Sequence, residues 1–199
     1  MSTRLTTQTE QAAVKAAGRG RTYDMAYIAV FAVLMAICSW ISIPTVIPFT
    51  LQTFAVFLAV CVLGGKRGTL SVIVFVLLGA IGVPVFAGFT GGLGIIMGNT
   101  GGYIIGFIFA GLLMWLVERI FGRKMWVQAV SMLLGMVTYY VFGTIWFMIV
   151  YMRTTGPVGL SAVLGWCVIP FIVPDLIKAA LALFLGNTLR RPLTAIMGE

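Results

Sequence analysis

Residues 160–189 read LSAVLGWCVIPFIVPDLIKAALALFLGNTL, an apolar run that contains one acidic and one basic side chain, Asp175 and Lys178. The two lie three residues apart, so on a helix both project from the same face. Each ionised group near the centre of a bilayer costs about 2.5–3.5 kcal/mol. The pattern therefore predicts a membrane-spanning helix whose charged pair belongs to a pathway or a binding site. A purely structural ion pair is the alternative.

The whole chain has the composition of an integral membrane protein. Hydrophobic residues make up 61% and charged residues 9% of its 199 residues, and its mean hydropathy is +1.10. In soluble domains charged residues make up about 25%. At about 20 residues per span, the chain has room for six helices and for no separate catalytic domain. We expect an all-α integral membrane protein with six transmembrane helices.

Apolar stretches separated by Pro, Gly and basic residues mark the expected spans. They are residues 25–43, 51–64, 69–84, 102–118, 125–152 and 160–189. Residues 1–23 are polar and lack an apolar core of their own, which predicts a flexible cytoplasmic tail. We expect residues 24–199 to form a single six-helix membrane domain.

Basic residues predict the orientation, because loops rich in Lys and Arg stay on the cytoplasmic side. With six spans and an inner N-terminus, eleven basic residues fall inside and only Arg153 falls outside. The inner residues are Arg4, Lys15, Arg19, Arg21, Lys66, Arg67, Arg119, Arg123, Lys124, Arg190 and Arg191. We therefore expect both termini to be cytoplasmic. The net charge of +8 is then explained by anionic lipid headgroups, without any nucleic acid.

Residues 82–103 form the glycine-rich connection expected outside, between the third and fourth spans. Gly91 and Gly92 allow backbone amides and carbonyls to approach a ligand closely. Thr90, Asn99 and Tyr103 add neutral hydrogen-bonding groups. We expect this segment to cover a small amphipathic molecule bound at the external face.

Several absences argue against an enzyme. The chain has no His, so it has no imidazole base or ligand for a metal. Its three cysteines are spread over three segments without paired spacing. Neither a dinucleotide fingerprint nor a P-loop occurs, so this chain is not expected to hydrolyse ATP. We expect no metal and no cofactor.

Six motifs, taken together, resemble the BioY family, the biotin-binding S components of energy-coupling factor (ECF) transporters. They are PFTLQ at 48–52, GGKRG at 64–68, GVPVF at 82–86, GGLG at 91–94, GNTGGY at 98–103 and PDLIKA at 174–179. The resemblance covers residues 26–191. Asn99 stands where the family usually has Pro, which concerns the conformation of the connection more than the family assignment.

The resemblance implies the ECF S-component fold and biotin as the ligand. Asp175 would accept hydrogen bonds from the two ureido N–H groups of biotin, and charge assistance would strengthen them. Lys178 would donate to the ureido oxygen and keep Asp175 ionised. The further candidates for contacts with the ligand are Thr90, Tyr103, Asn99, Gln52, Gly91 and Gly92.

The resemblance also implies partners in a prokaryotic plasma membrane. These are an ECF transmembrane coupling subunit and two cytoplasmic ATPase subunits, which supply the energy for delivery inward. Ala29, Ala32 and Ala36 form a small-residue face on the first span, and small residues permit close helix approach in lipid. We expect this face to dock the coupling subunit, with ordinary packing inside the chain as the alternative.

Three other functions remain open at this stage. The nearest is the same capture role for another vitamin. An intramembrane enzyme that uses Lys178 as a base is a second, and an ion or proton pathway through Asp175 is a third.

Overall fold

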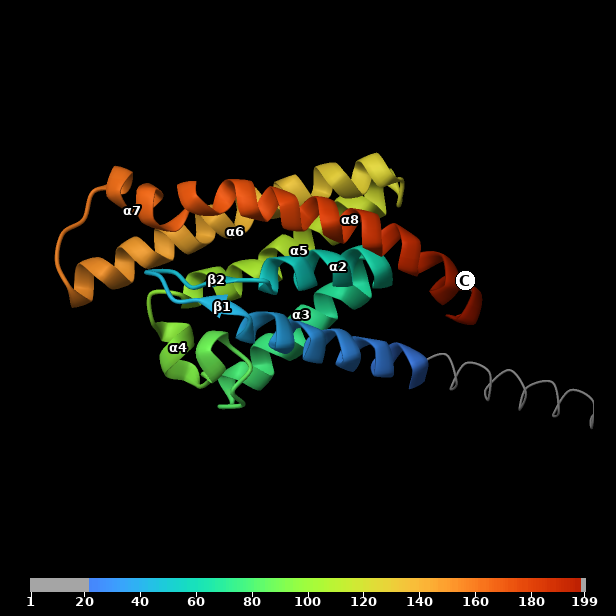
Figure 1. Ribbon diagram of the computed structural model, residues 1–199, viewed down its shortest axis with the longest axis horizontal. Coiled ribbons are helices and arrows are strands. Elements are labelled where there is room, and N and C mark those ends of the chain that lie inside the picture. The colour runs from blue at the N-terminus through green and yellow to red at the C-terminus, as the bar shows by residue number, and fades with distance from the viewer. Residues whose placement is uncertain (1–21, 198–199) are drawn as a thin grey trace, which may run out of the picture.

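The computed structural model describes residues 22–197 of the chain, and the side chains of residues 22–190. Helices make up most of the described part (Figure 1). After a first described helix, Thr22–Trp40, the helices are α2 (Gln52–Leu63), α3 (Gly65–Ala80), α4 (Leu93–Met97), α5 (Gly101–Phe121), α6 (Met125–Thr154), α7 (Leu160–Cys167) and α8 (Ile169–Met197), with a short 3₁₀ helix η1 (Ala87–Phe89) before α4.

Four helical segments of the described part are long and apolar enough to cross a bilayer. They are Thr22–Trp40, Gly101–Phe121, Met125–Thr154 and Leu160–Arg190, the last of which comprises α7 and most of α8. The helix α2 has 12 residues, which is about 18 Å and short of a hydrocarbon core of about 30 Å. The expectation of a helical membrane protein is thus met, while the count of six spans stays a prediction.

The connections between helices lie at the two ends of the long axis of the molecule (Figure 1). The start of the helix Thr22–Trp40, the end of α8 and the α5–α6 connection lie at one end. The segment with α4, the α6–α7 connection and α7 lie at the other. Residues 22 and 197 therefore lie at the same end of the molecule, as an even number of crossings requires.

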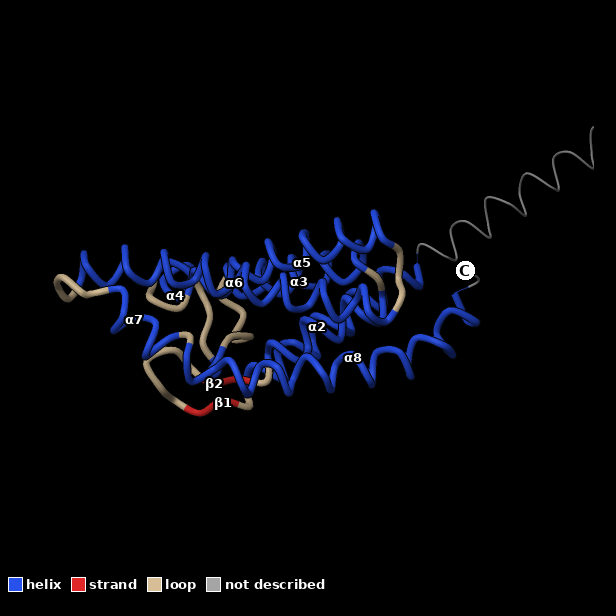
Figure 2. The backbone as a smooth tube through the Cα atoms, turned by 90° about the horizontal axis from the view of Figure 1, so that it is seen from above, coloured by secondary structure: helices blue, strands red, loops and turns tan. Residues whose placement is uncertain are grey.

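The helix α2 lies in the centre of the molecule, between α8 on one side and the layer of α3 and α5 on the other (Figure 2). Every residue of α2 except Phe54 is buried. A helix that is apolar on all sides is stable only where other elements surround it. This position explains why a helix too short to span a bilayer unaided has an almost uniformly apolar sequence.

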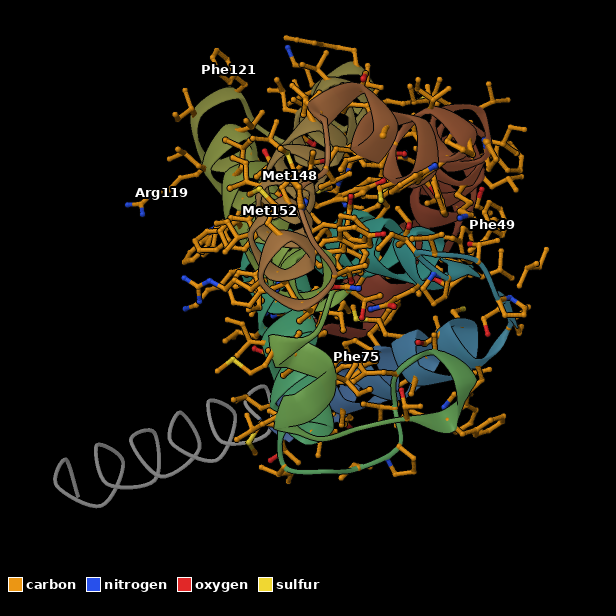
Figure 3. The ribbon with its side chains drawn as sticks, turned by 90° about the vertical axis from the view of Figure 1, so that its left-hand side faces the viewer. Phe49, Phe75, Arg119, Phe121, Met148 and Met152 are labelled. Carbon is orange, nitrogen blue, oxygen red and sulfur yellow. The ribbon has the colours of Figure 1, made fainter. Side chains whose placement is uncertain are left out.

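Side chains on the outside of the helices are also apolar, as expected for a protein in lipid. Val33, Ile145 and Phe184 are each more than half exposed. At the end of α5, Arg119 and Phe121 extend away from the helices (Figure 3). Arg119 thus adds a charge to the end of the molecule at which the described chain begins and ends.

The break between the second and third apolar stretches is shorter than the sequence suggests. We expected a connection over residues 64–68, but α3 begins at Gly65. Gly64 alone turns the chain, with φ of +85° and its N–H donated to the Val60 carbonyl oxygen at 3.0 Å. At Gly68 a Cβ atom would lie 2.5 Å from the Cα atom of Val60. The glycines therefore allow α2 and α3 to pack closely directly after the turn.

Two features depart from a simple run of helices. Residues Ser42–Ile43 (β1) and Phe49–Thr50 (β2) form a small antiparallel pair, in which Ser42 faces Thr50. The glycine-rich connection contains η1 and α4, and a β-bridge joins Phe86 to Thr90. Elements of two to five residues carry too few side chains to produce a periodic sequence signal.

The last apolar stretch contains a break at Val168, with φ of −126° and ψ of −59°, between α7 and α8. Pro170 lies in the first turn of α8, where its missing N–H would have no helical partner. The break thus ends α7 and lets α8 begin at Ile169. It places Asp175 and Lys178 on α8, close to the break.

Replacement of Gly68 by Ala tests the contact between α2 and α3. The added methyl group meets backbone rather than a movable side chain, so Gly68→Ala should lower the free energy of unfolding by about 1–3 kcal/mol. Thermal unfolding in detergent measures this. Gly165→Ala in α7 is the matched control, since its Cβ would have no neighbour within 4 Å. Equal stability of the two variants would contradict the close contact.

Candidate functional site

A cavity of about 280 Å³ lies toward the end of the molecule that carries α4 and α7. Residues from α2, α5, α6, α7 and α8 line it, together with residues from the β1–β2 segment and the glycine-rich connection. Small-molecule sites begin at about 300 Å³ and are mostly apolar with a few polar groups. The polar side chains of the lining are Thr50, Gln52, Thr53, Thr90, Thr100, Tyr103, Tyr139, Tyr140, Cys167, Asp175 and Lys178.

Asp175 and Lys178 form the ion pair that their spacing predicts. The Lys178 Nζ atom lies 2.8 Å from Asp175 Oδ1, and the two residues are 5% and 2% exposed, respectively. Burial of two charges is costly unless additional hydrogen bonds satisfy both groups. The neighbours of each group therefore determine whether this pair is stable.

Two tyrosines supply the additional hydrogen bonds to Asp175. The hydroxyls of Tyr139 and Tyr140, both on α6, donate to Asp175 Oδ2 at 2.6 and 2.7 Å. The carboxylate thus accepts three hydrogen bonds. Neither tyrosine was predicted from the sequence, although adjacent tyrosines within an apolar span are a usable signal, because a buried tyrosine hydroxyl usually finds a partner.

Lys178 has two further contacts. Its Nζ atom donates to the backbone carbonyl oxygen of Thr50 at 2.6 Å and lies 4.1 Å from the centre of the Phe49 ring. Both residues belong to β2. The pair therefore connects α8 to α6 through Asp175 and to the β1–β2 segment through Lys178.

Gln52 contributes a donor to the cavity that lacks a partner. The residue is 6% exposed, and its Oε1 atom accepts a hydrogen bond from Ser39 Oγ at 3.4 Å. Its Nε2 atom has no hydrogen-bond partner among the described residues. A buried donor without a partner costs about 1–3 kcal/mol. Because Gln52 lines the cavity, an acceptor on a bound ligand would remove this cost.

Thr90 and Tyr103, both expected from the sequence, line the same cavity. The Thr90 hydroxyl donates to the Ala87 carbonyl oxygen at 2.9 Å, so it stabilises the turn and keeps an acceptor available. The Tyr103 hydroxyl lies 3.5 Å from Thr144 Oγ1. Five of the predicted contact residues thus meet at one cavity: Gln52, Thr90, Tyr103, Asp175 and Lys178.

Three predicted residues lie outside the lining: Asn99, Gly91 and Gly92. Thr100, the neighbour of Asn99, lines the cavity. Gly92 has φ of +98°, and its N–H donates to the Gly79 carbonyl oxygen at 2.6 Å. A Cβ at Gly91 would collide with the carbonyl oxygen of Val83. In this structure the two glycines hold the connection against the end of α3.

The predicted docking face is only partly at the surface. Ala32 and Ala36 are 2% and 4% exposed, whereas Ala29 is exposed. The outward side of the helix Thr22–Trp40 instead carries larger apolar residues, including Val33 and Ile37. The structure thus favours packing inside the chain for Ala32 and Ala36, and docking at this face stays a prediction.

The geometry gives little support to catalysis in this cavity. Among the described residues that line it there is no serine for a Ser–Lys dyad with Lys178. Across the described part of the chain, no cluster of three or more His, Cys, Asp or Glu residues could hold a metal ion. The arrangement suits binding of a small molecule by hydrogen bonds and apolar contact.

Comparisons with known proteins agree on one family. The sequence profile of the BioY family matches residues 6–195. A probable biotin transporter BioY from Pyrococcus horikoshii is 40% identical over 168 residues, which cover 84% of this chain and 96% of the relative. The biotin transporter BioY from Thermotoga maritima is 39% identical over 165 residues, 81% of this chain and 92% of the relative.

A solved structure has a similar fold. The crystal structure of the S-component for biotin from an ECF-type ABC transporter superposes with a TM-score of 0.76 and 27% sequence identity. The match covers 86% of this chain and 92% of that one. The relatives are transporters, which confirms the prediction that this chain is not an enzyme.

Removal of one member of the buried pair tests the network around Asp175. Lys178→Met leaves a buried carboxylate without its cation, so the free energy of unfolding should fall by about 3–5 kcal/mol. Asp175→Asn combined with Lys178→Met removes both charges and should recover most of that loss. Thermal unfolding in detergent measures all three proteins. A Lys178→Met variant as stable as the unchanged protein would show that the pair is not buried as described.

Proposed function

Because the chain belongs to the BioY family, we propose that it captures biotin near the external face of the membrane and delivers it inward as the S component of an ECF transporter. The observation that carries the proposal is the buried Asp175–Lys178 pair in the wall of a cavity of ligand size. Similarity to the biotin transporters and to the S-component for biotin supports the same ligand.

The chemistry of biotin matches the groups of the cavity. Its ureido ring has two N–H donors and one carbonyl oxygen. Asp175 is the acceptor for one of the ureido N–H groups, because a carboxylate has about four lone-pair positions and three of them are occupied here. The unpartnered Nε2 atom of Gln52 and the Nζ atom of Lys178 are the donors to the ureido oxygen.

The apolar part of biotin suits the remaining lining. Phe86, Phe107 and Phe171 line the cavity and offer ring surfaces to the sulfur-containing ring. Thr90 and Tyr103 add hydroxyls. The two charges of the lining cancel, which fits a neutral ureido ring better than a cationic vitamin. Asn99, Gly91 and Gly92 then contribute through the shape of the connection that carries Thr90 and Thr100.

We assign the chain six spans, with both termini in the cytoplasm of a prokaryotic cell. The relatives from Pyrococcus and Thermotoga support the prokaryotic plasma membrane. The central position of α2 supports a span for this short helix, because neighbouring helices shield it from lipid. The expected cytoplasmic tail of residues 1–23 lies outside the described residues except for Thr22 and Tyr23, which already belong to the first described helix, and the single domain of residues 24–199 stays part of this proposal.

Energy comes from partners in this proposal. They are the transmembrane coupling subunit and two cytoplasmic ATPase subunits, and the ECF context of the structural relative supports them. The first described helix is the docking element, with Ala29 at the surface. Ala32 and Ala36 take part only if this helix moves, since both are buried in this conformation.

Equilibrium binding of radiolabelled biotin to the purified protein in detergent tests the capture function. Asp175→Asn and Lys178→Ala should each weaken binding at least about hundredfold, because each removes one partner of a buried charge pair. Thr188→Val on the same helix is the control, since Thr188 is exposed and donates to a carbonyl oxygen of α8.

Gel filtration and circular dichroism of each variant ensure that lost binding is not lost folding. A folded, unchanged protein that fails to bind biotin would reject the proposal. A panel of other vitamins would then follow.

Single cysteines test the orientation. Pro157→Cys, between α6 and α7, should react with a membrane-impermeant maleimide in intact cells, whereas Lys124→Cys, between α5 and α6, should react only after permeabilisation. Both positions are exposed, and the native cysteines are buried, so background labelling is low. Labelling of Lys124→Cys from outside would reverse the orientation.

A further inference from the structure

Both charged side chains in the described lining of the cavity already have partners. Asp175 and Lys178 are the charged members of its described lining, and they form an ion pair. Lys178 also donates to the Thr50 carbonyl oxygen and lies over the Phe49 ring. The described lining therefore offers no second cation for an anionic ligand group.

Biotin carries a carboxylate at the end of its tail, and this group needs an environment. A carboxylate that leaves water requires a cation or several donors, and it otherwise costs several kcal/mol per ion. At the ion pair itself Asp175, Lys178 and Tyr139 are nearly fully buried, while Thr50 and Tyr140 beside them are partly buried. A carboxylate placed there would face Asp175 itself.

The glycine-rich connection supplies another part of the lining. Thr90, Thr100 and Ala87 are only partly buried, and their side chains are neutral. The cavity is partly open to the surface. A tail that leaves by this route keeps its carboxylate in water, where hydration replaces any need for a cation.

We propose that the cavity recognises the ring system of biotin and leaves the tail carboxylate in water, so that the protein also captures biotin derivatives with a neutral carboxamide in place of the carboxylate. This inference rests on the proposed function. It extends the ligands of the site from one acid to a class, the tail-modified ureido compounds. A hydroxyl such as that of Thr100 can donate to a carboxylate and can donate to or accept from a carboxamide.

Arg153 is the cation that the competing explanation requires. It is exposed in the last turn of α6, just before the connection to α7, and is not part of the lining. A tail that reached Arg153 would gain a charge-assisted hydrogen bond that a carboxamide cannot reproduce. A variant that removes the charge of Arg153 therefore distinguishes the two explanations.

Competition against radiolabelled biotin tests the proposal. The competitors are biotin, its primary carboxamide and pentanoate, measured on the purified protein in detergent at neutral pH. We expect the carboxamide to compete with less than about a tenfold loss of affinity, and pentanoate, which keeps only the tail, not to compete. Arg153→Gln should leave the ratio of biotin to carboxamide affinity unchanged.

The other outcomes would overturn the inference, and each would identify a different reason. Tight binding of biotin with a carboxamide tenfold or more weaker would show that the carboxylate is recognised, while the capture function stands. An effect of Arg153→Gln on biotin but not on the carboxamide would assign that recognition to Arg153. Failure of the folded protein to bind biotin at all would reject the proposed function together with the inference.

Discussion

The buried pair of Asp175 and Lys178 is the constraint around which the half of the molecule that carries α4 and α7 is arranged. Two charges in an apolar interior are tolerated only when every partner is in position. Tyr139 and Tyr140 satisfy the carboxylate from α6, and the Thr50 carbonyl oxygen satisfies the ammonium group from β2. Two segments far apart in the sequence, α6 and β2, are thereby held against α8, and both contribute to the wall of the cavity.

Close packing of other elements positions the remaining walls of the cavity. The helix α2 is buried on all sides and brings Gln52 to the wall of the cavity at its first residue. Gly64 and Gly68 allow α3 to return directly along α2. Gly91 and Gly92 hold the connection with η1 and α4 against the end of α3, so that Thr90 faces the cavity. Glycines outside the lining thus position the groups that form it.

Much of the site was predictable because its signals are local. Asp175 and Lys178 stand out as charges in an apolar stretch, and their spacing alone predicts the ion pair. Tyr139 and Tyr140 were missed because their partner is 35 or more residues away, and no local pattern announces such a contact. Asn99 was predicted at the ligand, but its neighbour Thr100 lines the cavity. The choice between neighbours depends on a turn whose geometry local patterns do not specify.

By itself the sequence determined the membrane class, the approximate apolar stretches and the one charged pair within them, because composition and helical spacing are properties of short stretches of chain. The tertiary structure alone decided which side chains meet that pair and which predicted residues line the cavity. It also decided that Ala32 and Ala36 face inward while Ala29 stays exposed. Such contacts depend on how separate helices pack, and a small residue permits close approach without specifying to which neighbour.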